Sequence, residues 1–517
     1  MSDERSGKKY SVLFAIALSI AVFLLGAFNL DNNCNWGDDY AAYMADGIAI
    51  AEGKYEEQIH TNAFLRFGGT DDAMTHVHSF GMPLIHSLVY RICGFDRTGF
   101  NNLYAYKLPS LIMLSAMCAV FYLFLRRRTD QYISALLAFA LCCGMEFFYA
   151  IRNLGNDVMF MALTMLCIYE MEIFSSGKKS TPRAAFTGVL LWTLVSVRLN
   201  GAGVLAAALL YHICTLIRNR QKPEFVDFIP YLVFAALFLV INCIIFPKPT
   251  STSRMSDVTA ENFIGGIEYY SFQIYYYFWG VIENVLVAPV RFVQRIVFPG
   301  KDPVRIYSAM NTLLTSSFLA VMLIGLFARG LKKDTVISIL VAASFLITAG
   351  LGLGQGLRYL YNILPFLYMY FAYGLRVLSG LSKQKIRVRH GWIKALCSAA
   401  LCIFIAVPII KADIENIKDT SGEQLTAYSD SAVEAYNYIR KNVEKGSTVA
   451  FFKPRALYLN TEVLSFVPKT NGMKVSEGDY YLYYKPDPDF LLSEEETDNY
   501  TNVFENEDFR LLKKNKQ

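Results

Sequence analysis

Residues 11–30 read SVLFAIALSIAVFLLGAFNL, a run in which no side chain carries a charge. A helix needs about 20 apolar residues to cross a bilayer, because every backbone polar group has to be satisfied inside the segment. This stretch therefore predicts a transmembrane helix. No A-x-A-like cleavage site follows it, so we expect an uncleaved anchor and not a signal peptide.

Ten further apolar runs repeat this pattern, so the sequence predicts eleven spans. The fifth and sixth spans are short and are separated only by Arg198, Leu199 and Asn200, which predicts a helical hairpin with a polar tip. The ten runs are Leu108–Leu125, Tyr132–Ala150, Val158–Phe174, Ala184–Val197, Gly201–Leu216, Phe228–Phe246, Tyr307–Ala328, Thr335–Leu353, Leu357–Leu378 and Trp392–Ile410.

The composition of the 517-residue chain agrees with a membrane protein. Hydrophobic residues make up 54% of the chain and charged residues 18%, whereas soluble domains carry about 25% charge; mean hydropathy is +0.31. A disordered chain, a disulfide scaffold and a soluble enzyme are excluded. The last 107 residues hold 14 basic and 19 acidic side chains, which leaves 35 basic and 25 acidic in the rest. The positive excess therefore belongs to the membrane portion.

Basic clusters between the spans set the orientation, since Lys and Arg are retained in the cytoplasm. With eleven spans and the N-terminus inside, all six clusters fall on the cytoplasmic side. An aromatic stretch, Phe263–Phe298, is interrupted by charges and is expected to lie along the outer interface, because counting it as a span would turn the last two clusters outward. The clusters are Arg5/Lys8/Lys9, Arg126–Arg128, Lys178/Lys179/Arg183, Arg218/Arg220/Lys222, Arg329/Lys332/Lys333 and Lys383/Lys385/Arg387/Arg389.

Three larger regions are expected outside the membrane. They are a first loop from Asp31 to Lys107, a second loop from Pro247 to Arg305 and a tail from Lys411 to Gln517. The tail predicts a small α/β domain, because a helical face over Ala432–Ile439 is followed by short strand-like runs. We therefore expect a transmembrane domain over residues 1–410, an extracytoplasmic domain over residues 411–517, and a functional site at the outer face.

The first loop opens with Trp36-Gly-Asp-Asp-Tyr-Ala-Ala-Tyr-Met-Ala-Asp46, which predicts a helix capped by Asp38 and stopped by Gly53. Asp39, Tyr43 and Asp46 would share the face opposite its apolar residues. We assign Asp38 to the cap and Asp39 to chemistry. The alternative is that both aspartates only favour a helix N-terminus through its dipole.

Several polar residues fall at the outer ends of spans, where charges are costly and tend to mark a site. Snorkelling to the interface explains each one singly, but their convergence on one face favours a site. They are Arg152, Asn156, Asp157, Arg198, Asn200 and Arg358.

The sequence gives weaker support for a metal site and for a disulfide bond. Asp71, Asp72, His76 and His78 offer usable metal ligands, with His76, His78 and Asp72 as the candidates, but their spacing matches no specific zinc pattern and favours a polar loop. Cys34 and Cys93 are both expected outside, and the sequence does not decide whether they pair. No cofactor is required by the sequence, and a divalent metal stays an open alternative.

These motifs together resemble the GT-C superfamily of polyprenyl-phosphate-dependent glycosyltransferases, nearest to the branch of protein O-mannosyltransferases and the lipid A aminoarabinose transferase. The family's Gly-Asp-aromatic-x-x-Tyr pattern matches Gly37 to Tyr43. Its aromatic-x-G-x-P-L-L stretch resembles residues 79–85, and its G-x-R-Y segment resembles residues 356–365. Further similarities lie at Asn156-Asp157, at Arg198-Leu-Asn-Gly201, at Lys107 and at Lys453 to Tyr458 in the tail. The region from Pro247 to Arg305 does not align.

The resemblance implies a polytopic α-helical membrane protein of GT-C type with a small extracytoplasmic α/β domain, in a bacterial cell membrane. It implies transfer of a sugar from a polyprenyl-phosphate donor to a lipid, glycan or protein acceptor at the outer face, with inversion and with no nucleic acid involved. Asp39 would be the general base, with Asp38 beside it. The implied substrate-binding residues are Arg358, Tyr359, Arg198, Lys107, Asp157 and Tyr43.

Three other classes of protein fit the composition. A transporter or flippase of lipid-linked glycans would place its strongest charges near the membrane midplane, whereas here they lie at one surface. An O-antigen ligase or polymerase also acts outside on lipid-linked sugars, but uses a different donor linkage. A membrane protein with a sensor-like tail would leave Asp39 and Arg358 unexplained.

Overall fold

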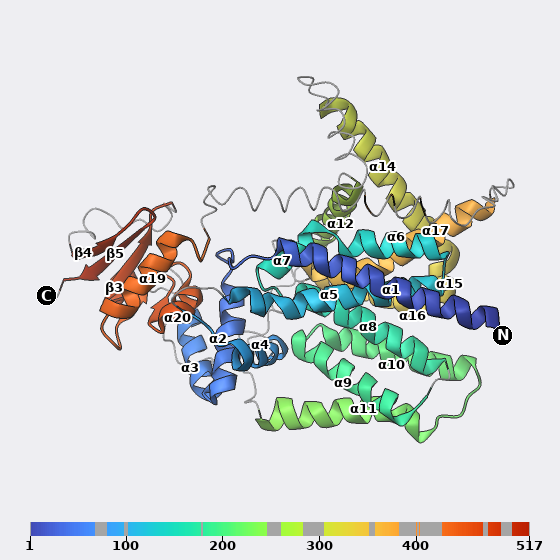
Figure 1. The fold of residues 1–517 in the computed structure, drawn as a ribbon, viewed down its shortest axis with the longest axis horizontal. Coiled ribbons are helices and arrows are strands. Elements are labelled where there is room, and N and C mark those ends of the chain that lie inside the picture. The colour runs from blue at the N-terminus through green and yellow to red at the C-terminus, as the bar shows by residue number, and fades with distance from the viewer. Residues whose placement is uncertain are drawn as a thin grey trace.

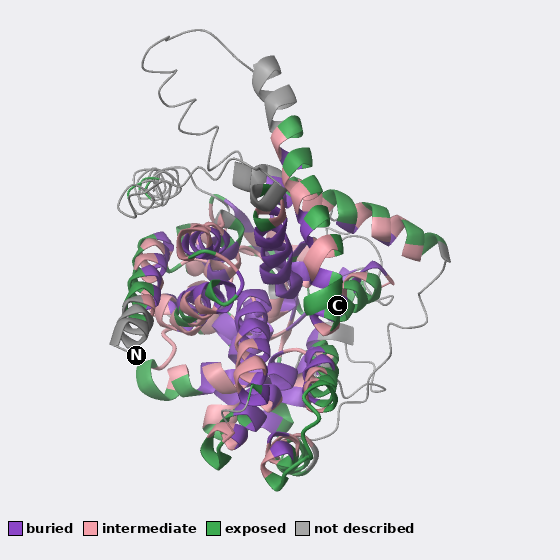
Figure 2. Cartoon of the chain, turned by 90° about the vertical axis from the view of Figure 1, so that its right-hand side faces the viewer, coloured by how far each residue is buried: buried purple, intermediate pink, exposed green. Residues whose placement is uncertain are grey.

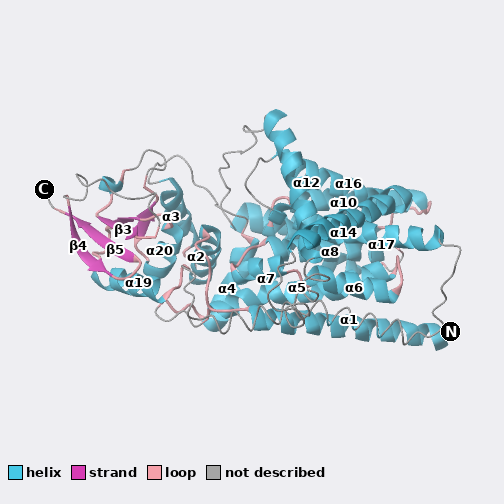
Figure 3. Ribbon diagram, turned by 90° about the horizontal axis from the view of Figure 1, so that it is seen from above, coloured by secondary structure: helices cyan, strands magenta, loops and turns pink. Residues whose placement is uncertain are grey.

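The computed structural model describes residues 2–67, 80–97, 102–176, 179–245, 260–282, 304–350, 357–381, 426–468, 474–486 and 499–515, and the single positions 396, 400 and 403. A large helical bundle occupies one end of the molecule and a small α/β domain the other (Figure 1). Three helices of the first loop lie between the two parts, and the view from above shows the same order (Figure 3). They are α2 (Asp38–Glu52), α3 (Tyr55–Phe67) and α4 (Gly81–Cys93).

The bundle contains the long apolar helices that the sequence predicts. Two of them continue as π-helical turns, η1 (Phe238–Ile245) and η4 (Leu326–Gly330), and a 3₁₀ segment, η5 (Leu357–Ile363), precedes the last. The α-helices are α1 (Ser2–Asn29), α5 (Leu103–Arg126), α6 (Gln131–Cys142), α7 (Met145–Arg152), α8 (Asp157–Ser175), α9 (Thr181–Val197), α10 (Gly201–Arg218), α11 (Phe225–Leu237), α12 (Ala260–Ile282), α14 (Val304–Gly325), α15 (Leu331–Lys333), α16 (Thr335–Gly350) and α17 (Leu364–Leu381).

Six stretches of the described chain are long and apolar enough to cross a membrane, and the bent pair α6–α7 makes a seventh when it is counted as one span. The chain is thus a multi-pass membrane protein. The count of eleven spans stays a prediction, because α9 and α16 are shorter than a full span and Trp392–Ile410 lies almost wholly outside the described residues. The six stretches are Ser11–Asn29, Leu103–Arg126, Asp157–Ser175, Gly201–Arg218, Phe225–Asn242 and Thr312–Lys333.

The predicted span Tyr132–Ala150 is broken in the structure. Its two halves, α6 and α7, meet at a bend of 43°. Gly144 has an extended backbone and caps the second half.

Helix α8 lies at the centre of the bundle. Within its apolar window 72% of the residues are buried, compared with 22% for α1 and 11% for the stretch Phe225–Asn242. A helix that is apolar all round belongs in an interior, whereas the outer helices keep an apolar face for lipid. The buried residues accordingly gather in the middle of the molecule (Figure 2).

One end of α8 lies in a network of charges. Arg128, from the turn after α5, forms ion pairs of 2.9 Å with Glu172 on α8 and with Asp334 before α16. Arg183 on α9 pairs with Glu170 at 2.8 Å. Members of two of the predicted basic clusters therefore lie at this end. Since α8 has 19 residues, its other end lies roughly 28 Å away.

The aromatic stretch after residue 260 forms α12, which packs against α14, α16 and η5. Gly266 approaches the backbone of Ala349 so closely that an added Cβ would lie 2.0 Å from its carbonyl oxygen. Tyr270, Tyr277 and Phe278 are buried against the bundle. Helix α12 is not among the candidate spans of the described chain, and its place along the outer interface stays a prediction.

The tail holds a five-stranded sheet in the order β2-β1-β3-β5-β4, in which β1 is parallel to β2 and β3, and β5 is antiparallel to β3 and β4. The first three strands match the strand-like runs that the sequence predicts at 448–452, 463–467 and 480–484, whereas β4 and β5 were not predicted. Helix α19 (Asp430–Asn442) buries Ala432, Tyr436 and Ile439 as expected, with Ala435 buried in addition. The strands are β1 (Thr448–Ala450), β2 (Leu464–Phe466), β3 (Tyr480–Tyr484), β4 (Tyr500–Glu505) and β5 (Phe509–Lys514).

The tail and the first loop share one apolar core, in which residues of α2 pack with residues of α19, α20 (Pro454–Thr461) and the sheet. Trp36, just before α2, lies among the rings of Phe451, Phe452, Tyr484 and Phe509, with centroids 5.1–6.1 Å away. Because this core is continuous, the tail has a fixed position relative to α2.

Candidate active site

Helix α2 carries the predicted catalytic residue. Gly37 is its N-cap, so Asp38 is the first helical residue and not the cap that the sequence suggested; its side chain lies outside the description. Asp39 follows in the first turn, where unpaired N–H groups favour an ionised carboxylate. Gly53 ends the helix with φ of 74°, a conformation that glycine adopts without strain, as predicted.

Helix α2 is buried on nearly every side. Tyr43 and Asp46 are 4% and 1% exposed, so the face opposite the apolar residues does not meet solvent as an amphipathic helix would. Asp46 accepts a hydrogen bond of 2.7 Å from Asn62, which in turn accepts one from Gln58. Burial raises the pKa of Asp46 to about 7, although Asn62 and the charge of Arg455 oppose this.

Asp39 itself stays accessible, with its side chain 48% exposed. Its Oδ1 lies 3.7 Å from Nη1 of Arg455, the second residue of α20 in the tail. The carboxylate therefore lies at the junction of the first loop, the bundle and the tail.

A second carboxylate starts α8. Asp157 is buried and forms an ion pair with Arg198, which follows α9 directly. Asn156 Nδ2 donates to the carbonyl of Val197 at 3.3 Å and fixes the same turn. The two motifs that the sequence separates by some 40 residues are thus joined at the end of the bundle opposite the Arg128 network.

A glycine on α4 allows this turn to form where it does. A Cβ on Gly81 would lie 2.6 Å from the backbone carbon of Ser196 and the backbone nitrogen of Val197. Only a residue without a side chain allows α4 to approach the end of α9 this closely. Because Val197 precedes Arg198, this contact positions the arginine.

Arg358 and Tyr359 lie on η5. The guanidinium of Arg198 lies 4.6 Å from the centroid of the Tyr359 ring, and that of Arg358 lies 5.3 Å from it. Two arginines therefore contact one aromatic ring, an arrangement that holds guanidinium groups at a fixed spacing.

Tyr43 lies within electrostatic range of the charged groups of this region. Its pKa is raised, first by burial and then by the charges of Asp39 and Asp157, whereas Arg198 and Arg358 lower it. One hydroxyl therefore interacts with four charges from α2, α8, the α9–α10 turn and η5. Six of the predicted site residues are brought together: Asp39, Tyr43, Asp157, Arg198, Arg358 and Tyr359.

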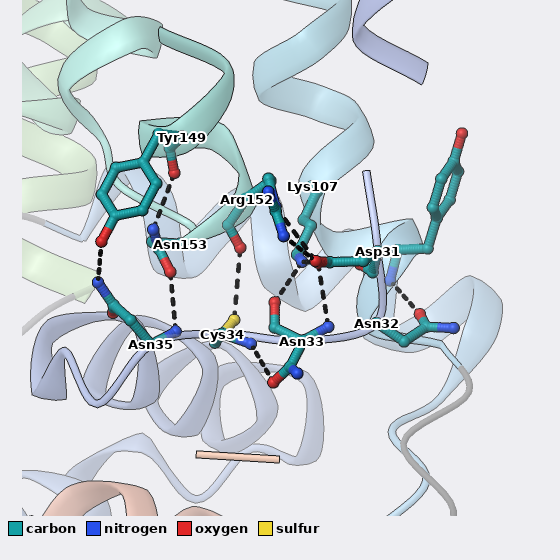
Figure 4. Close-up of polar contacts among 10 residues, drawn as sticks. Asp31, Asn32, Asn33, Cys34, Asn35, Lys107, Tyr149, Arg152 and Asn153 are labelled. Carbon is teal, nitrogen blue, oxygen red and sulfur yellow. Dashed lines mark hydrogen bonds and ion pairs between the residues drawn. The ribbon is translucent and has the colours of Figure 1, made fainter. Parts of the chain in front are cut away.

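Lys107 lies in a different network (Figure 4). Its side chain is fully buried, and Nζ donates to Asp31 Oδ1 at 2.7 Å and to the carbonyls of Asp31 and Asn33. Arg152 donates to the other oxygen of Asp31, with Nε at 3.1 Å. Burial raises the pKa of Asp31, but Lys107 and Arg152 outweigh it, so the net shift is downward.

This network holds the segment between α1 and α2. Cys34 Sγ donates to the Arg152 carbonyl at 3.5 Å, and the Asn35 backbone N–H donates to Asn153 Oδ1 at 2.8 Å. Cys34 is buried, Cys93 is exposed and both are free thiols in the structure. Lys107 and Arg152 thus fix the segment that leads into α2.

No protein-family model matches the sequence, and no curated protein matches it significantly. In structure, ArnT from Cupriavidus metallidurans bound to undecaprenyl phosphate is similar over 96% of this chain and 97% of its own, with a TM-score of 0.57 and 11% identity. The chain has the GT-C fold.

Two further solved structures support the GT-C fold. ArnT in the apo state aligns over 98% of both chains, with a TM-score of 0.51 and 11% identity. The Archaeoglobus fulgidus oligosaccharyltransferase in the apo form aligns over 92% of this chain and 69% of its own, with a TM-score of 0.54 and 12% identity. At these identities the similarity establishes the fold, and the predicted resemblance is confirmed at that level.

Two residues near this candidate site were missed from the sequence. Arg455 was noted only as part of a tail motif, because nothing in the sequence links it to α2. Glu146, at the start of α7, lies close enough to Tyr361 to act on it together with Asp157 and Arg358. Its place inside an apolar run was the available signal, since a carboxylate at membrane depth is costly.

The candidate metal ligands cannot be placed in the GT-C fold, since Asp71, Asp72, His76 and His78 lie outside the described residues. Within the part of the chain that is described, no group of three or more His, Cys, Asp or Glu side chains is arranged to hold a metal ion.

Proposed function

We propose that the chain is a membrane glycosyltransferase that moves a sugar from a polyprenyl-phosphate donor to an acceptor at the extracytoplasmic face. The observation that carries this proposal is that the charges of Asp39, Asp157, Arg198 and Arg358 all act on the buried Tyr43 side chain. The GT-C fold adds support, since ArnT, which shares it, binds undecaprenyl phosphate.

Asp39 acts as the general base. The acceptor hydroxyl has to lose its proton as its oxygen attacks the anomeric carbon, and a positioned carboxylate accepts that proton. Asp39 suits this role because it starts a helix, which favours the ionised form, and because half of its side chain is accessible. Attack from the face opposite the lipid phosphate inverts the anomeric centre in a single displacement. Asp38 is the neighbouring carboxylate of the same helical turn.

Arg358 and Arg198 stabilise the leaving phosphate. A lipid phosphate needs no proton donor, but the negative charge that develops on it needs fixed cations. Both guanidinium groups lie over Tyr359, which limits their motion. Asp157 holds Arg198 through an ion pair and so orients the cation. Tyr43, buried beneath these charges, supplies a hydroxyl at the same place.

Lys107 supports the site indirectly. Its three hydrogen bonds all go to the segment that enters α2, so it fixes the position from which Asp39 extends. The sequence grouped Lys107 with the phosphate-binding residues; its complete burial favours this positioning role.

The sidedness follows from charge. The end of the bundle that holds Arg128 and Arg183 is cytoplasmic under the rule that basic loops stay inside, so the site at the opposite end faces outward. A bacterial cell membrane, with lipid, glycan or protein as the acceptor, is the proposed setting.

A donor screen tests the proposal. Purified protein in liposomes is incubated with defined polyprenyl-phosphate sugars and a mixture of acceptors, and free polyprenyl phosphate and glycosylated products are measured by mass spectrometry. Release of polyprenyl phosphate with a matching product is expected. Movement of the intact donor between leaflets without release would support a flippase instead, and acceptance of only pyrophosphate-linked donors would support a ligase or polymerase.

A further inference from the structure

The tail places one cation beside the proposed catalytic base. Arg455 is 11% exposed, and its Nη1 lies 3.7 Å from Asp39 Oδ1. Its charge also acts on Asp46, two helical turns further along the same face of α2. A residue more than 400 positions away in the sequence is thus an ion-pair partner of Asp39.

The position of Arg455 is set by helix packing. It is the second residue of α20, whose Ala456 and Leu457 are completely buried in the core that also contains Tyr40 and Met44 of α2. The arginine therefore extends from one rigid helix towards another. A distance of 3.7 Å is too long for a direct hydrogen bond. The contact is therefore an electrostatic one, which orients the carboxylate without a hydrogen bond from Arg455 Nη1 to Oδ1.

We propose that Arg455 is a positioning residue, which holds the Asp39 carboxylate in its reactive orientation and makes sugar transfer depend on the docking of the C-terminal domain against α2. This inference rests on the proposed function of Asp39. In this proposal the C-terminal domain contributes Arg455 to a site whose catalytic base, Asp39, comes from the first loop.

The charges around Asp39 decide what loss of Arg455 does. Arg358 on η5 interacts electrostatically with Asp39, and so does Tyr43, which lies on the same helix as Asp39. The charges of Asp157 and Arg198 act on Tyr43 as well. These groups remain when Arg455 is replaced. Removing one nearby cation makes the ionised carboxylate less favourable, so the pKa of Asp39 should rise and activity should fall off at a higher pH than in the wild type.

The test compares Arg455→Gln and Arg455→Lys with a matched control, Arg440→Gln. Arg440 also joins the tail to the first loop, because Nη2 donates to the Arg97 carbonyl at 2.6 Å, but it belongs to a separate contact beside Asn460. Arg455→Gln should lower kcat about tenfold and shift the acid limb of the kcat profile upward by about one pH unit. Arg455→Lys should keep most of the wild-type kcat and a nearly unshifted acid limb. Arg440→Gln should leave the acid limb unchanged.

A second readout does not require catalysis. The half-exposed Asp39 carboxyl can be coupled to an amine with a water-soluble carbodiimide over a series of pH values, and the labelled peptide quantified by mass spectrometry. The labelling midpoint should move upward in Arg455→Gln and not in Arg440→Gln. An unchanged midpoint would overturn the inference. A shifted midpoint in a protein that transfers no sugar would retain the Arg455 contact and refute the proposed function.

Discussion

Arg198 forms an ion pair with Asp157, so the turn between α9 and α10 is joined to the first residue of α8. The side chains are 14% and 7% exposed, and the pair lies at one end of the central helix of the bundle. A buried charge pair is costly unless it is well satisfied, and it is more often kept for orientation than for stability. In the proposed site this pair aims a cation at the donor phosphate.

A double-mutant cycle tests that relationship. Asp157→Asn should lower kcat/KM by about 10- to 100-fold, because Arg198 loses the partner that orients it. Arg198→Gln should have a similar effect, and the double variant should be little worse than the poorer single variant, with a coupling of about 2 kcal/mol. Strictly additive losses would show that the two residues act independently.

Arg358→Ala should weaken binding of polyprenyl phosphate by roughly 10- to 100-fold, since a charge-assisted contact to phosphate contributes about 1.5–3 kcal/mol. Arg358→Lys should be intermediate, because Lys keeps the charge but lacks the planar fork. Arg91→Ala, at an exposed position on α4, serves as the control. Fluorescence or calorimetric titration with polyprenyl phosphate measures these affinities, and equal affinity of Arg358→Ala and wild type would exclude the role.

Gly81→Ala should disturb the site through the backbone. The added methyl would overlap Ser196 and Val197 at 2.6 Å, so we expect a loss of about 1–3 kcal/mol in unfolding free energy and a drop in kcat/KM. Gly203→Ala is the matched control, since nothing lies within 4 Å of its added Cβ. Equal activity of the two variants would show that the approach of α4 to α9 does not position Arg198.

Asp31→Asn should destabilise the protein by about 2–3 kcal/mol at pH 7, because it leaves Lys107 buried with its counter-charge removed. Asp31 has a lowered pKa in the folded chain, so its contribution is fully present above its usual pKa of about 3.9 and is lost as the pH falls through the lowered value. Thermal unfolding in detergent should show a lower melting temperature for the variant than for the wild type, and this gap should narrow below about pH 4. Asp430→Asn, at an exposed tail position, should show no such gap.

The spans and the main site residues were accessible from the sequence because their signals are local. Long apolar runs predicted α1, α5 and α8 to within a few residues, apart from the charged start of α1, and Gly53 ended α2 as expected. Polar residues at the ends of apolar runs were costly enough to mark Asp157, Arg198 and Arg358, and the structure brings these three together.

The remaining features depend on contacts between distant segments. The partners of Lys107 and the approach of Arg455 to Asp39 join residues that no periodicity connects. The bend between α6 and α7 falls at Gly144, whose extended backbone any residue can adopt, so no local signal marked it. Burial of α2 depends on α3, α4 and α20, which pack against it. The polar face predicted for Asp39, Tyr43 and Asp46 therefore did not reveal that Tyr43 and Asp46 are buried.

Release of polyprenyl phosphate by wild type and by Asp39→Asn, measured side by side in liposomes with one accepted donor, is the most direct test of the account. The variant keeps the shape of the side chain and removes its charge, so expression, thermal stability and donor affinity should stay close to those of the wild type. We predict that its turnover falls by a factor of about 1,000 or more, in keeping with the loss of a general base. Full turnover by Asp39→Asn would contradict the account.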